Sequence, residues 1–383
     1  MENRIILNEL SYHGYGALDG IGEVMQSKGY GKAVVFSDAF LKESGLLGKI
    51  TEILDRIEIP YEIFTAIDPN PSIKNVLEGL ESIKKAEADV ILAVGGGSVM
   101  DCAKAAGIVH TNPEFSDVSS LAGVADTKKP ATPIIAVATT AGTASEVTIN
   151  YVITDTENKK KLVCVDPHVL PVAAIVDPTM METMPADLTA ATGMDALTHA
   201  IEGYITKGAW EMTDMFHLEA IKWIAKYLPA AVRNEKKGRE MMALAQYTAG
   251  MGFSNVGLGI VHSMAHPLGA LYNTPHGVAN AIILPTVMEY NAENTGEKYK
   301  HIARVMGVEG TEEMTEDEYR KAAVKAVRDL AKEVNIPESL AGIIEEKDIS
   351  FLADSAMKDA CTPGNPKDPT KEEIEKMYQD MLK

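Results

Sequence analysis

Cysteine and positive charge are both scarce in this chain of 383 residues. The three cysteines, Cys102, Cys164 and Cys361, lie far apart and form no CxxC pair. This spacing predicts neither a disulfide framework nor a thiolate zinc site, and it fits a reducing cytoplasm. The 36 Lys and Arg residues face 55 Asp and Glu residues, which gives a formal net charge of −19. Nucleic acid and anionic membranes are therefore not expected as partners, because both attract clustered basic residues.

A secretory signal and a long apolar run are also missing. The first ten residues, MENRIILNEL, lack a basic segment followed by an apolar one, so no signal peptide is expected. Residues 241–288 contain no Asp, Glu, Lys or Arg, but they include Asn, Gln, His, Pro and several Gly. A membrane span needs about 20 mainly apolar residues. We therefore predict that residues 241–288 form buried core rather than a span.

Short β-branched runs alternate with helical patterns in the first half of the chain. The predicted strands are apolar runs that end in turn residues: 32–38, 89–98, 133–143 and 172–178. Residues 72–88 between them have the spacing of an amphipathic helix. This alternation is typical of a parallel sheet covered on both faces. After about Pro185 only helical patterns remain, so we predict an α/β dinucleotide-binding domain, residues 1–184, and an all-α metal-binding domain, residues 185–383.

A glycine-rich turn follows the second predicted strand, in VILAVGGGSVMDCAKAAG. Gly95, Gly96 and Gly97 can adopt positive φ and let a ligand approach the backbone. Ser98 stands three residues before Asp101, which is the spacing of a capping box. The following helix offers N–H groups and the positive end of its dipole, which favour a phosphate. A tight strand–helix turn without a ligand explains this motif equally well on its own.

Two other strand ends favour a ligand. TTAGT presents Thr139, Thr140 and Thr143 beside a second turn of small residues. Asp38 ends the first predicted strand, where a carboxylate can bind both ribose hydroxyls and repel a 2′-phosphate; alone, it would more simply cap a helix. Ligands of open α/β sheets bind at the carboxyl ends of the strands. The three features together therefore predict a dinucleotide, NAD rather than NADP.

Five potential metal ligands gather in two segments. Asp195 and His199 stand four apart in a predicted helix and so share a face, and His262, His266 and His276 fall in the uncharged segment. Burying several imidazoles without partners is costly, and a divalent metal offsets that cost. One Asp oxygen with two or three His nitrogens suits Zn²⁺ or Fe²⁺, and an open position would make the metal a Lewis acid. One of the five is expected not to be a ligand. The remaining histidines stand in polar or helix-surface contexts and are expected to be ordinary: His13, His110, His168, His217 and His301.

Four motifs resemble those of the iron-containing, group III alcohol dehydrogenase family: GGGSVMDCAK, TTAGTASEVT, GMDALTHAIEGY and HSMAHPLGALYNTPHG. The resemblance runs along the whole chain through TINYVITD, VCVDPH, GMGFSNVGLG, GEKY and CTPGNP. It implies a metal-dependent, NAD(H)-linked oxidoreductase that interconverts a short aldehyde and alcohol, with lactaldehyde and 1,2-propanediol as the expected pair. It also implies a homodimer, in which the N-terminal segment RIILNEL could pair as a strand across the interface.

The resemblance assigns roles to individual residues. The implied ligands of Fe²⁺, with Zn²⁺ as the alternative, are Asp195, His199, His262 and His276. His266 is implied to be a catalytic residue near the nicotinamide. The implied NAD-binding residues are Asp38, Asn70, Gly96, Gly97, Ser98, Asp101, Thr139, Thr140, Thr143 and Lys161. The implied substrate residues are Asn150, Phe253, Leu258 and Cys361.

Other functions stay open at this point. A short-chain alcohol or 1,3-propanediol dehydrogenase of the same family would use the same residues. A zinc- and NAD-dependent lyase of the dehydroquinate-synthase type shares the general architecture, but it would turn over without a net change in NADH. The two glycine-bearing turns disfavour a metal-binding protein without catalysis, because such a protein needs no dinucleotide.

Overall fold

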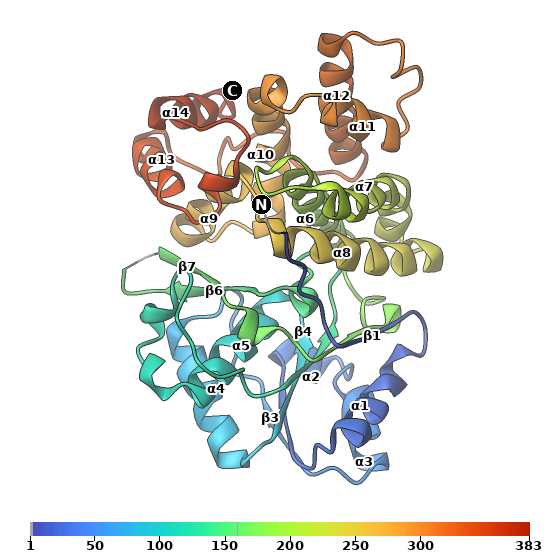
Figure 1. The fold of residues 1–383 in the computed structure, drawn as a ribbon, viewed down its shortest axis with the longest axis vertical. Helices are drawn as coiled ribbons and strands as arrows, with labels where there is room; N and C mark the ends of the chain where they lie inside the picture. Colours follow the sequence, from blue (N-terminus) through green and yellow to red (C-terminus); the bar gives the residue numbers. More distant parts are fainter. Residues whose placement is uncertain (1–2, 159) are drawn as a thin grey trace. The chain divides into compact units, whose positions relative to one another are not determined.

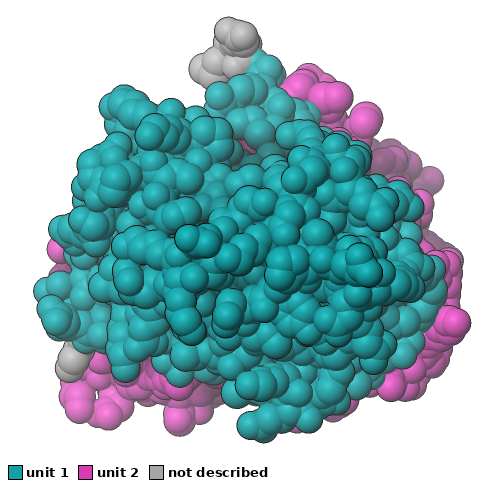
Figure 2. Space-filling view, turned by 90° about the horizontal axis from the view of Figure 1, so that it is seen from below, with its two compact units in different colours: residues 1–140, 144–183 teal, residues 141–143, 184–383 magenta. Residues whose placement is uncertain are grey.

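The chain folds into two compact units in a computed structural model that describes residues 3–158 and 160–383. Unit 1 comprises Met1–Thr140 and Ala144–Thr183, and unit 2 comprises Ala141–Thr143 and Met184–Lys383 (Figure 2). The predicted functional domains, 1–184 and 185–383, stay a prediction.

Unit 1 is built around a six-stranded parallel sheet, of which Figure 1 labels β1, β3 and β4. The strand order is β1-β8-β5-β4-β2-β3. Its strands are β1 (Leu10–His13), β2 (Ala33–Phe36), β3 (Tyr61–Phe64), β4 (Val90–Gly95), β5 (Ile134–Ala138) and β8 (Ala173–Val176). The four strands expected from the sequence correspond to β2, β4, β5 and β8, and each of these is buried along its whole length. Near-continuous burial explains why they read as uninterrupted apolar runs.

Helices alternate with these strands. They are α1 (Gly20–Lys28), α2 (Ala39–Glu43), α3 (Gly48–Arg56), α4 (Ile73–Ala86) and α5 (Gly97–Thr111). The shorter 3₁₀ helices are η1 (Ala17–Asp19), η2 (Pro113–Phe115), η3 (Val118–Leu121), η4 (Ser145–Val147), η5 (Pro167–Val169) and η6 (Pro178–Met180). Helix α4 confirms the amphipathic prediction and starts at a capping box between Ser72 and Asn75. An apolar core joins α1 and α3 to the sheet through Ile21, Ile50 and Leu92.

Two segments of unit 1 lie outside this alternation. Strands β6 (Asn150–Asp155) and β7 (Lys160–Val165) form an antiparallel pair. At the N-terminus, only the last residue of the RIILNEL segment, Leu10, belongs to a strand. A strand requires a hydrogen-bonded neighbour, and within the described chain the pairing of β1 begins at Leu10. The predicted pairing across a dimer is not tested by a single chain.

All named elements in the described residues of unit 2 are helices. The α-helices are α6 (Ala186–Ile205), α7 (Glu211–Val232), α8 (Lys236–Val256), α9 (Ile260–Tyr272), α10 (His276–Asn291), α11 (Lys298–Val305), α12 (Glu316–Glu333), α13 (Ile349–Met357) and α14 (Lys371–Asp380). The 3₁₀ helices are η7 (Ala292–Asn294), η8 (Glu346–Asp348) and η9 (Thr362–Gly364). The uncharged residues 241–288 fall in α8, α9 and α10 and are largely buried, as predicted. Among the described helices, none is both long and apolar enough to cross a membrane.

Glycines let the helices of unit 2 approach closely. A Cβ atom on Gly193 of α6 would lie 2.2 Å from Leu228 Cδ1 of α7, and one on Gly277 of α10 would lie 2.3 Å from the carbonyl oxygen of Ala191. Only glycine fits such contacts between backbone and neighbouring helix. The close approach brings α6 and α10 near enough for their polar side chains to meet. The predicted fold class, a parallel α/β unit followed by a helical one, is confirmed.

Candidate metal centre and cofactor-binding residues

Helices α6, α9 and α10 each contribute potential ligands to one cluster in unit 2. Asp195 lies on α6, His262 in the first turn of α9, and His276 is the first residue of α10. One ligand atom of each lies within 4.8 Å of the other two. Asp195 Oδ1 is 3.6 Å from His276 Nε2 and 4.0 Å from His262 Nε2. One carboxylate oxygen and two imidazole nitrogens therefore face a common point.

His199, one helical turn after Asp195 on α6, adjoins this cluster. Its Nε2 is 3.0 Å from His262 Nε2, and its buried Nδ1 has no hydrogen-bond partner in the described structure. Phe253 stacks on the His199 ring, with 4.3 Å between centroids and 13° between planes. Burial lowers the pKa of His199, and burial together with the neighbouring imidazoles lowers that of His262 well below its usual value. Both rings are therefore neutral, which is the form that binds a metal.

The donor set fits the metals expected from the sequence. A carboxylate with three imidazoles is a ligand set that both Fe²⁺ and Zn²⁺ accept. Without a cation, two imidazole nitrogens 3.0 Å apart can share at most one proton, and the unpartnered Nδ1 of His199 adds to the cost of burial. The geometry supports the four predicted ligands, whose role stays a prediction.

Asn280, one turn after His276 on α10, was missed by the sequence reasoning. Its amide nitrogen lies 2.7 Å from Asp195 Oδ1, 3.2 Å from His262 Nε2 and 3.1 Å from His276 Nε2. The side chain is completely buried. The only signal in the sequence was its spacing of four residues from a histidine, which places both on one helical face.

Glu202 of α6 was missed as well. Its Oε2 lies 2.5 Å from His262 Nδ1, and its Oε1 accepts a 2.7 Å hydrogen bond from Val261 N. The carboxyl group is 2% exposed, and burial raises its pKa to about 8 although backbone N–H groups oppose the shift. Asp195, His199 and Glu202 are spaced i, i+4, i+7, and this pattern could have indicated a third polar residue on the same face of the helix.

His266 lies beside the cluster but outside the group of converging ligand atoms. Its Nδ1 is 2.7 Å from Asp359 Oδ2, and its ring stacks on His276 at 5.5 Å between centroids and 9° between planes. Asp359 Oδ1 also accepts a hydrogen bond of 2.9 Å from Cys361 N. The separate partner supports a role other than metal ligand for His266, and that role stays a prediction.

Three of the four predicted substrate residues belong to unit 2. Phe253 of α8 is buried against His199, Leu258 is buried in the turn between α8 and α9, and Cys361 follows Asp359 directly. Burial raises the pKa of Cys361 well above its usual value, so its thiol is protonated at neutral pH. The fourth, Asn150, begins β6 of unit 1. None of the four substrate assignments is tested by these positions.

The turn between β4 and α5 differs from its sequence-based description. Gly95, Gly96 and Gly97 have no positive φ; instead, close packing explains Gly95 and Gly96. A Cβ atom on Gly95 would lie 2.5 Å from the Val99 side chain. The predicted capping box of Ser98 is wrong, because Gly96 is the N-cap and Ser98 is already inside the helix, where its Oγ accepts a 3.3 Å hydrogen bond from the backbone of Asn70. The helix N-terminus thus carries no side-chain cap of its own.

A network of buried hydrogen bonds connects other predicted NAD residues of unit 1. Lys161 Nζ donates to Asn70 Oδ1 at 2.8 Å, and Asp101 accepts from Ser145 Oγ at 2.9 Å. Lys104, which the sequence reasoning missed, is completely buried and donates to the carbonyl oxygen of Asn150 at 2.8 Å. Burial lowers the pKa of both lysines to about 8. Helix α5 is thereby fixed to the β6–β7 pair.

The remaining predicted NAD residues lie at two other turns. Asp38 is the N-cap of α2, where its Oδ1 accepts a 2.8 Å hydrogen bond from Leu41 N. Helix capping is the simpler of the two roles considered for Asp38. The second carboxylate oxygen would then have to accept the hydrogen bonds from the ribose hydroxyls. Thr139 and Thr140 follow β5 in unit 1, whereas Thr143 belongs to the short segment counted with unit 2.

Comparisons with known proteins identify the family. The family model of the iron-containing alcohol dehydrogenases matches residues 9–178, and that of their C-terminal region matches residues 189–382. Lactaldehyde reductase of Escherichia coli K12 is 53% identical over 379 residues, which cover 99% of each chain. The chain belongs to the iron-containing alcohol dehydrogenase family.

Two further relatives agree with this assignment. The NAD-dependent methanol dehydrogenase of Bacillus methanolicus is 39% identical over 96% of this chain and 97% of its own. The crystal structure of a 1,3-propanediol oxidoreductase superposes with a TM-score of 0.96 at 40% identity and covers both chains completely. The resemblance found in the motifs is thus confirmed for the family and for the fold. It favours the dehydrogenases over the lyase alternative.

One histidine expected to be ordinary is not on the surface. His217 of α7 is completely buried, and neither ring nitrogen has a hydrogen-bond partner in the described structure. Its ring fits between two glycines: a Cβ atom on Gly203 or Gly252 would lie 2.4 or 2.2 Å from its Nε2. Burial lowers its pKa to about 3. The expectation failed because polar neighbours in sequence do not show which face of a helix is covered.

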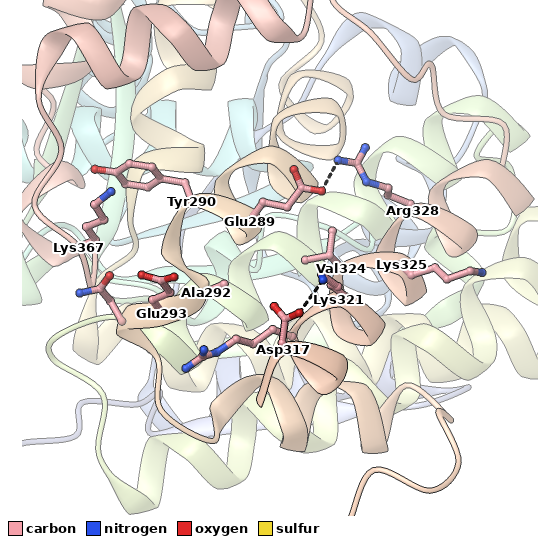
Figure 3. A pocket seen from close by; sticks show the side chains of 12 residues that line it. Glu289, Tyr290, Ala292, Glu293, Asp317, Lys321, Val324, Lys325, Arg328 and Lys367 are labelled. Carbon is pink, nitrogen blue, oxygen red and sulfur yellow. Dashed lines mark hydrogen bonds and ion pairs between the residues drawn. The ribbon is translucent and has the colours of Figure 1, made fainter. Parts of the chain in front are cut away.

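A pocket of about 500 Å³ in unit 2 is separate from the predicted site residues (Figure 3). It is lined by residues of α10, η7 and α12 and by Lys367. Two ion pairs join its charged side chains, Arg328 with Glu289 at 2.9 Å and Lys321 with Asp317 at 2.6 Å. Lys367 Nζ lies 3.8 Å from the centre of the Tyr290 ring. No predicted ligand or substrate residue is among the residues that line this pocket.

Proposed function

We propose that the chain is a metal-dependent, NAD(H)-linked oxidoreductase that reduces lactaldehyde to 1,2-propanediol and can catalyse the reverse reaction. The observation that carries the proposal is the convergence of the buried Asp195, His199 and His262 with the partly exposed His276. The identity of 53% to a lactaldehyde reductase supports the substrate, and the similarity to an NAD-dependent dehydrogenase supports the cofactor.

The four converging side chains would hold Fe²⁺, or Zn²⁺ as the alternative that the same donors accept. When bound, the metal supplies Lewis acidity to the carbonyl oxygen, and NADH supplies the hydride. Phe253 covers one face of the His199 ring and so keeps water from that side of the ligand. Burial of Asp195 and His262 at 2% exposure keeps the electrostatic attraction between ligands and cation strong.

Unit 1 would bind the dinucleotide. Its proposed contacts are the residues that the motifs indicated: Asp38, Asn70, Gly96, Gly97, Ser98, Asp101, Thr139, Thr140 and Lys161, with Thr143 from the short segment counted with unit 2. The start of α5 has no side-chain cap and offers N–H groups to a phosphate. Asp101 and Lys161 already contact protein groups, so they would shape the site as well as bind in it.

His266 would transfer the proton that completes reduction. The hydrogen bond to Asp359 holds the proton of a neutral ring at Nδ1 and leaves Nε2 as the atom that accepts and releases a proton. The parallel stacking of His266 on His276 limits rotation of the ring. Asn150, Leu258 and Cys361, with Phe253, would contact the substrate.

The test is a metal analysis of anaerobically purified protein followed by NADH oxidation with a panel of aldehydes. We expect about one metal ion per chain and the highest kcat/KM with lactaldehyde. The panel includes 3-hydroxypropionaldehyde, because the similarity to a 1,3-propanediol oxidoreductase supports that substrate as the second candidate. Turnover of none of the aldehydes, or turnover without consumption of NADH, would contradict the proposal.

We also propose a cytoplasmic homodimer. The family resemblance supports the dimer, and strand β1, which follows the RIILNEL segment, lies at an edge of the sheet, where a strand of a second copy can pair. The free cysteines Cys102, Cys164 and Cys361 support a reducing compartment. Light scattering on the eluting protein tests the dimer, and a mass of one chain would exclude it.

A further inference from the structure

We propose that Glu202 is the positioning residue of the metal centre: its carboxylate fixes the tautomer of His262 and the start of helix α9 at the same time. This inference rests on the proposed metal site. It concerns a residue that lies within the motif GMDALTHAIEGY but has no role assigned by the resemblance or by the converging ligand atoms, and it follows from contacts within unit 2 alone.

Glu202 stands on the ligand-bearing face of α6. It follows Asp195 by seven residues and His199 by three, so the three side chains leave the helix on one side. The carboxyl group is 2% exposed. A buried carboxylate needs partners for both oxygens, since burying an unpaired charge is costly. Both partners come from the first turn of α9.

The first partner is the backbone of α9. The N-terminal N–H groups of a helix have no acceptor within it. Gly259, the N-cap of α9, has no side chain to supply one, and Glu202 Oε1 accepts the N–H of Val261 at 2.7 Å instead. A Cβ atom on Gly259 would lie 2.9 Å from that oxygen, so the glycine makes room for the carboxylate. Glu202 thus caps α9 from the neighbouring helix.

The second partner is the ring of His262. Its Nε2 faces Asp195 and His199, whereas its Nδ1 lies 2.5 Å from Glu202 Oε2. A neutral imidazole has one proton, and Nε2 offers a lone pair only when that proton is on Nδ1. The contact of Oε2 with Nδ1 stabilises this tautomer when Glu202 is ionised, and the positive charge of a bound cation would favour the ionised form against the effect of burial. Carboxylates beside ligating histidines act in this way in metal sites.

The variant Glu202→Gln separates the two functions of the carboxylate. Glutamine keeps the size of the side chain but has one acceptor oxygen and one donor NH₂. If the oxygen keeps the bond to Val261 N, the NH₂ group must donate to Nδ1 of His262. The ring proton then moves to Nε2, where it opposes a cation. We expect the Kd for Co²⁺ or Zn²⁺ to rise about 10–100-fold.

The matched control is Asp359→Asn. It makes the same chemical change in a second buried carboxylate, which lies 2.7 Å from His266 Nδ1. His266 is not among the proposed ligands, so the affinity for metal should stay within about twofold of wild type, while the pH profile of aldehyde reduction shifts. A second variant, Glu202→Asp, keeps two acceptor oxygens and should recover part of the affinity that Glu202→Gln loses.

Affinity is measured by anaerobic titration of the metal-free proteins with Co²⁺, whose visible spectrum reports coordination, in competition with a chelator. A Glu202→Gln protein that binds as tightly as wild type would overturn the inference. A wild-type protein that binds no metal would instead overturn the proposed function. If Glu202→Gln does not fold, ¹⁵N shifts of labelled histidines in the Zn²⁺-loaded wild type decide: a proton on Nδ1 of His262 supports the inference, and coordination through Nδ1 contradicts it.

Discussion

The buried polar side chains of the two units differ in their hydrogen-bond partners. In unit 1, the buried Lys104 ammonium donates to Ser145 Oγ and to the carbonyl oxygens of Thr148 and Asn150, all within 2.9 Å. In unit 2, the Nε2 atoms of His199 and His262 face each other instead. Protein acceptor atoms thus surround the buried charge in unit 1, whereas the imidazoles of unit 2 converge on one point.

This difference separates a cluster with a structural role from one that requires a ligand. Buried polar groups in folded proteins nearly always have hydrogen-bond partners. Where the protein provides them, as for Lys104, the cluster stabilises the unit without an added group. Where acceptor nitrogens face a carboxylate and one another, as at His262, a cation is the partner that satisfies all of them together. The variants below test this distinction, from the largest expected effect to the smallest.

Removing a ligand should break the unit 2 cluster. We expect His262→Ala and His276→Ala each to lose the metal and aldehyde reduction together. Metal affinity and kcat/KM should both fall by more than about 100-fold, which is the upper loss expected when only a hydrogen-bond partner of a ligand is removed. Metal content by elemental analysis and kcat/KM measure the two effects. His110→Ala in unit 1, where the ring pairs with Thr132, is the control and should keep both. Loss of activity with full metal content would mean that the altered histidine is not a ligand.

His266→Ala sharpens the boundary of the cluster. This histidine pairs with Asp359 rather than with the converging atoms, so the variant should keep its metal. We expect kcat to fall about 10²–10⁴-fold, the usual contribution of a positioned acid or base. Elemental analysis of the purified variant decides, because a metal-free His266→Ala protein would place this side chain among the ligands.

His217 tests burial of an imidazole without a metal. Its pKa is about 3 in the folded protein, against 6.5 ordinarily, so below pH 6.5 the unfolded chain takes up a proton that the folded chain does not. Stability from this group is therefore lost as the pH falls from 6.5 to about 3. Between pH 7.5 and pH 5, the stability of His217→Leu relative to wild type should improve by about 2 kcal/mol. Urea unfolding at both pH values measures it; an unchanged difference would show that His217 has a partner.

Asp38 tests the unit 1 side of the comparison. Asp38→Asn keeps an N-cap for α2 but removes the charge that should repel a 2′-phosphate, whereas Asp38→Gly removes both functions. We expect the ratio of kcat/KM for NADH to that for NADPH to fall about tenfold in both variants, as expected for the loss of one charged hydrogen bond. Equal selectivity in wild type and Asp38→Asn would leave Asp38 as a helix cap only.

Much of the architecture could be predicted from local patterns, because buried parallel strands read as apolar runs and α4 has a clear helical period. The structure of the N-terminal RIILNEL segment could not be predicted in this way. A strand forms only beside a hydrogen-bonded neighbour, and the sequence does not show which segment that neighbour is. The prediction for Ser98 failed for a similar reason. A capping-box spacing is compatible with several helix starts, and the packing of Gly95 on Val99 and the N-cap at Gly96 decide between them.

The site was predictable where ligands repeat at helical spacing, as at Asp195 and His199. Glu202, Asn280 and Lys104 were missed because each acts on a residue from another helix or strand. The burial of a polar residue on a helix can be predicted only when the elements that cover the helix are known. This also explains the error at His217. Partners of these residues lie far away in the chain: Asp195 is 85 positions from Asn280, and His262 is 60 positions from Glu202.

The central claim is that the converging side chains of unit 2 hold one divalent metal ion. Calorimetric titration of the metal-free protein with Zn²⁺ under reducing conditions tests it most directly. We expect saturation at one ion per chain and loss of this binding in the double variant His262→Ala, His276→Ala. No saturable binding by the wild-type protein, or equal binding by the double variant, would contradict it.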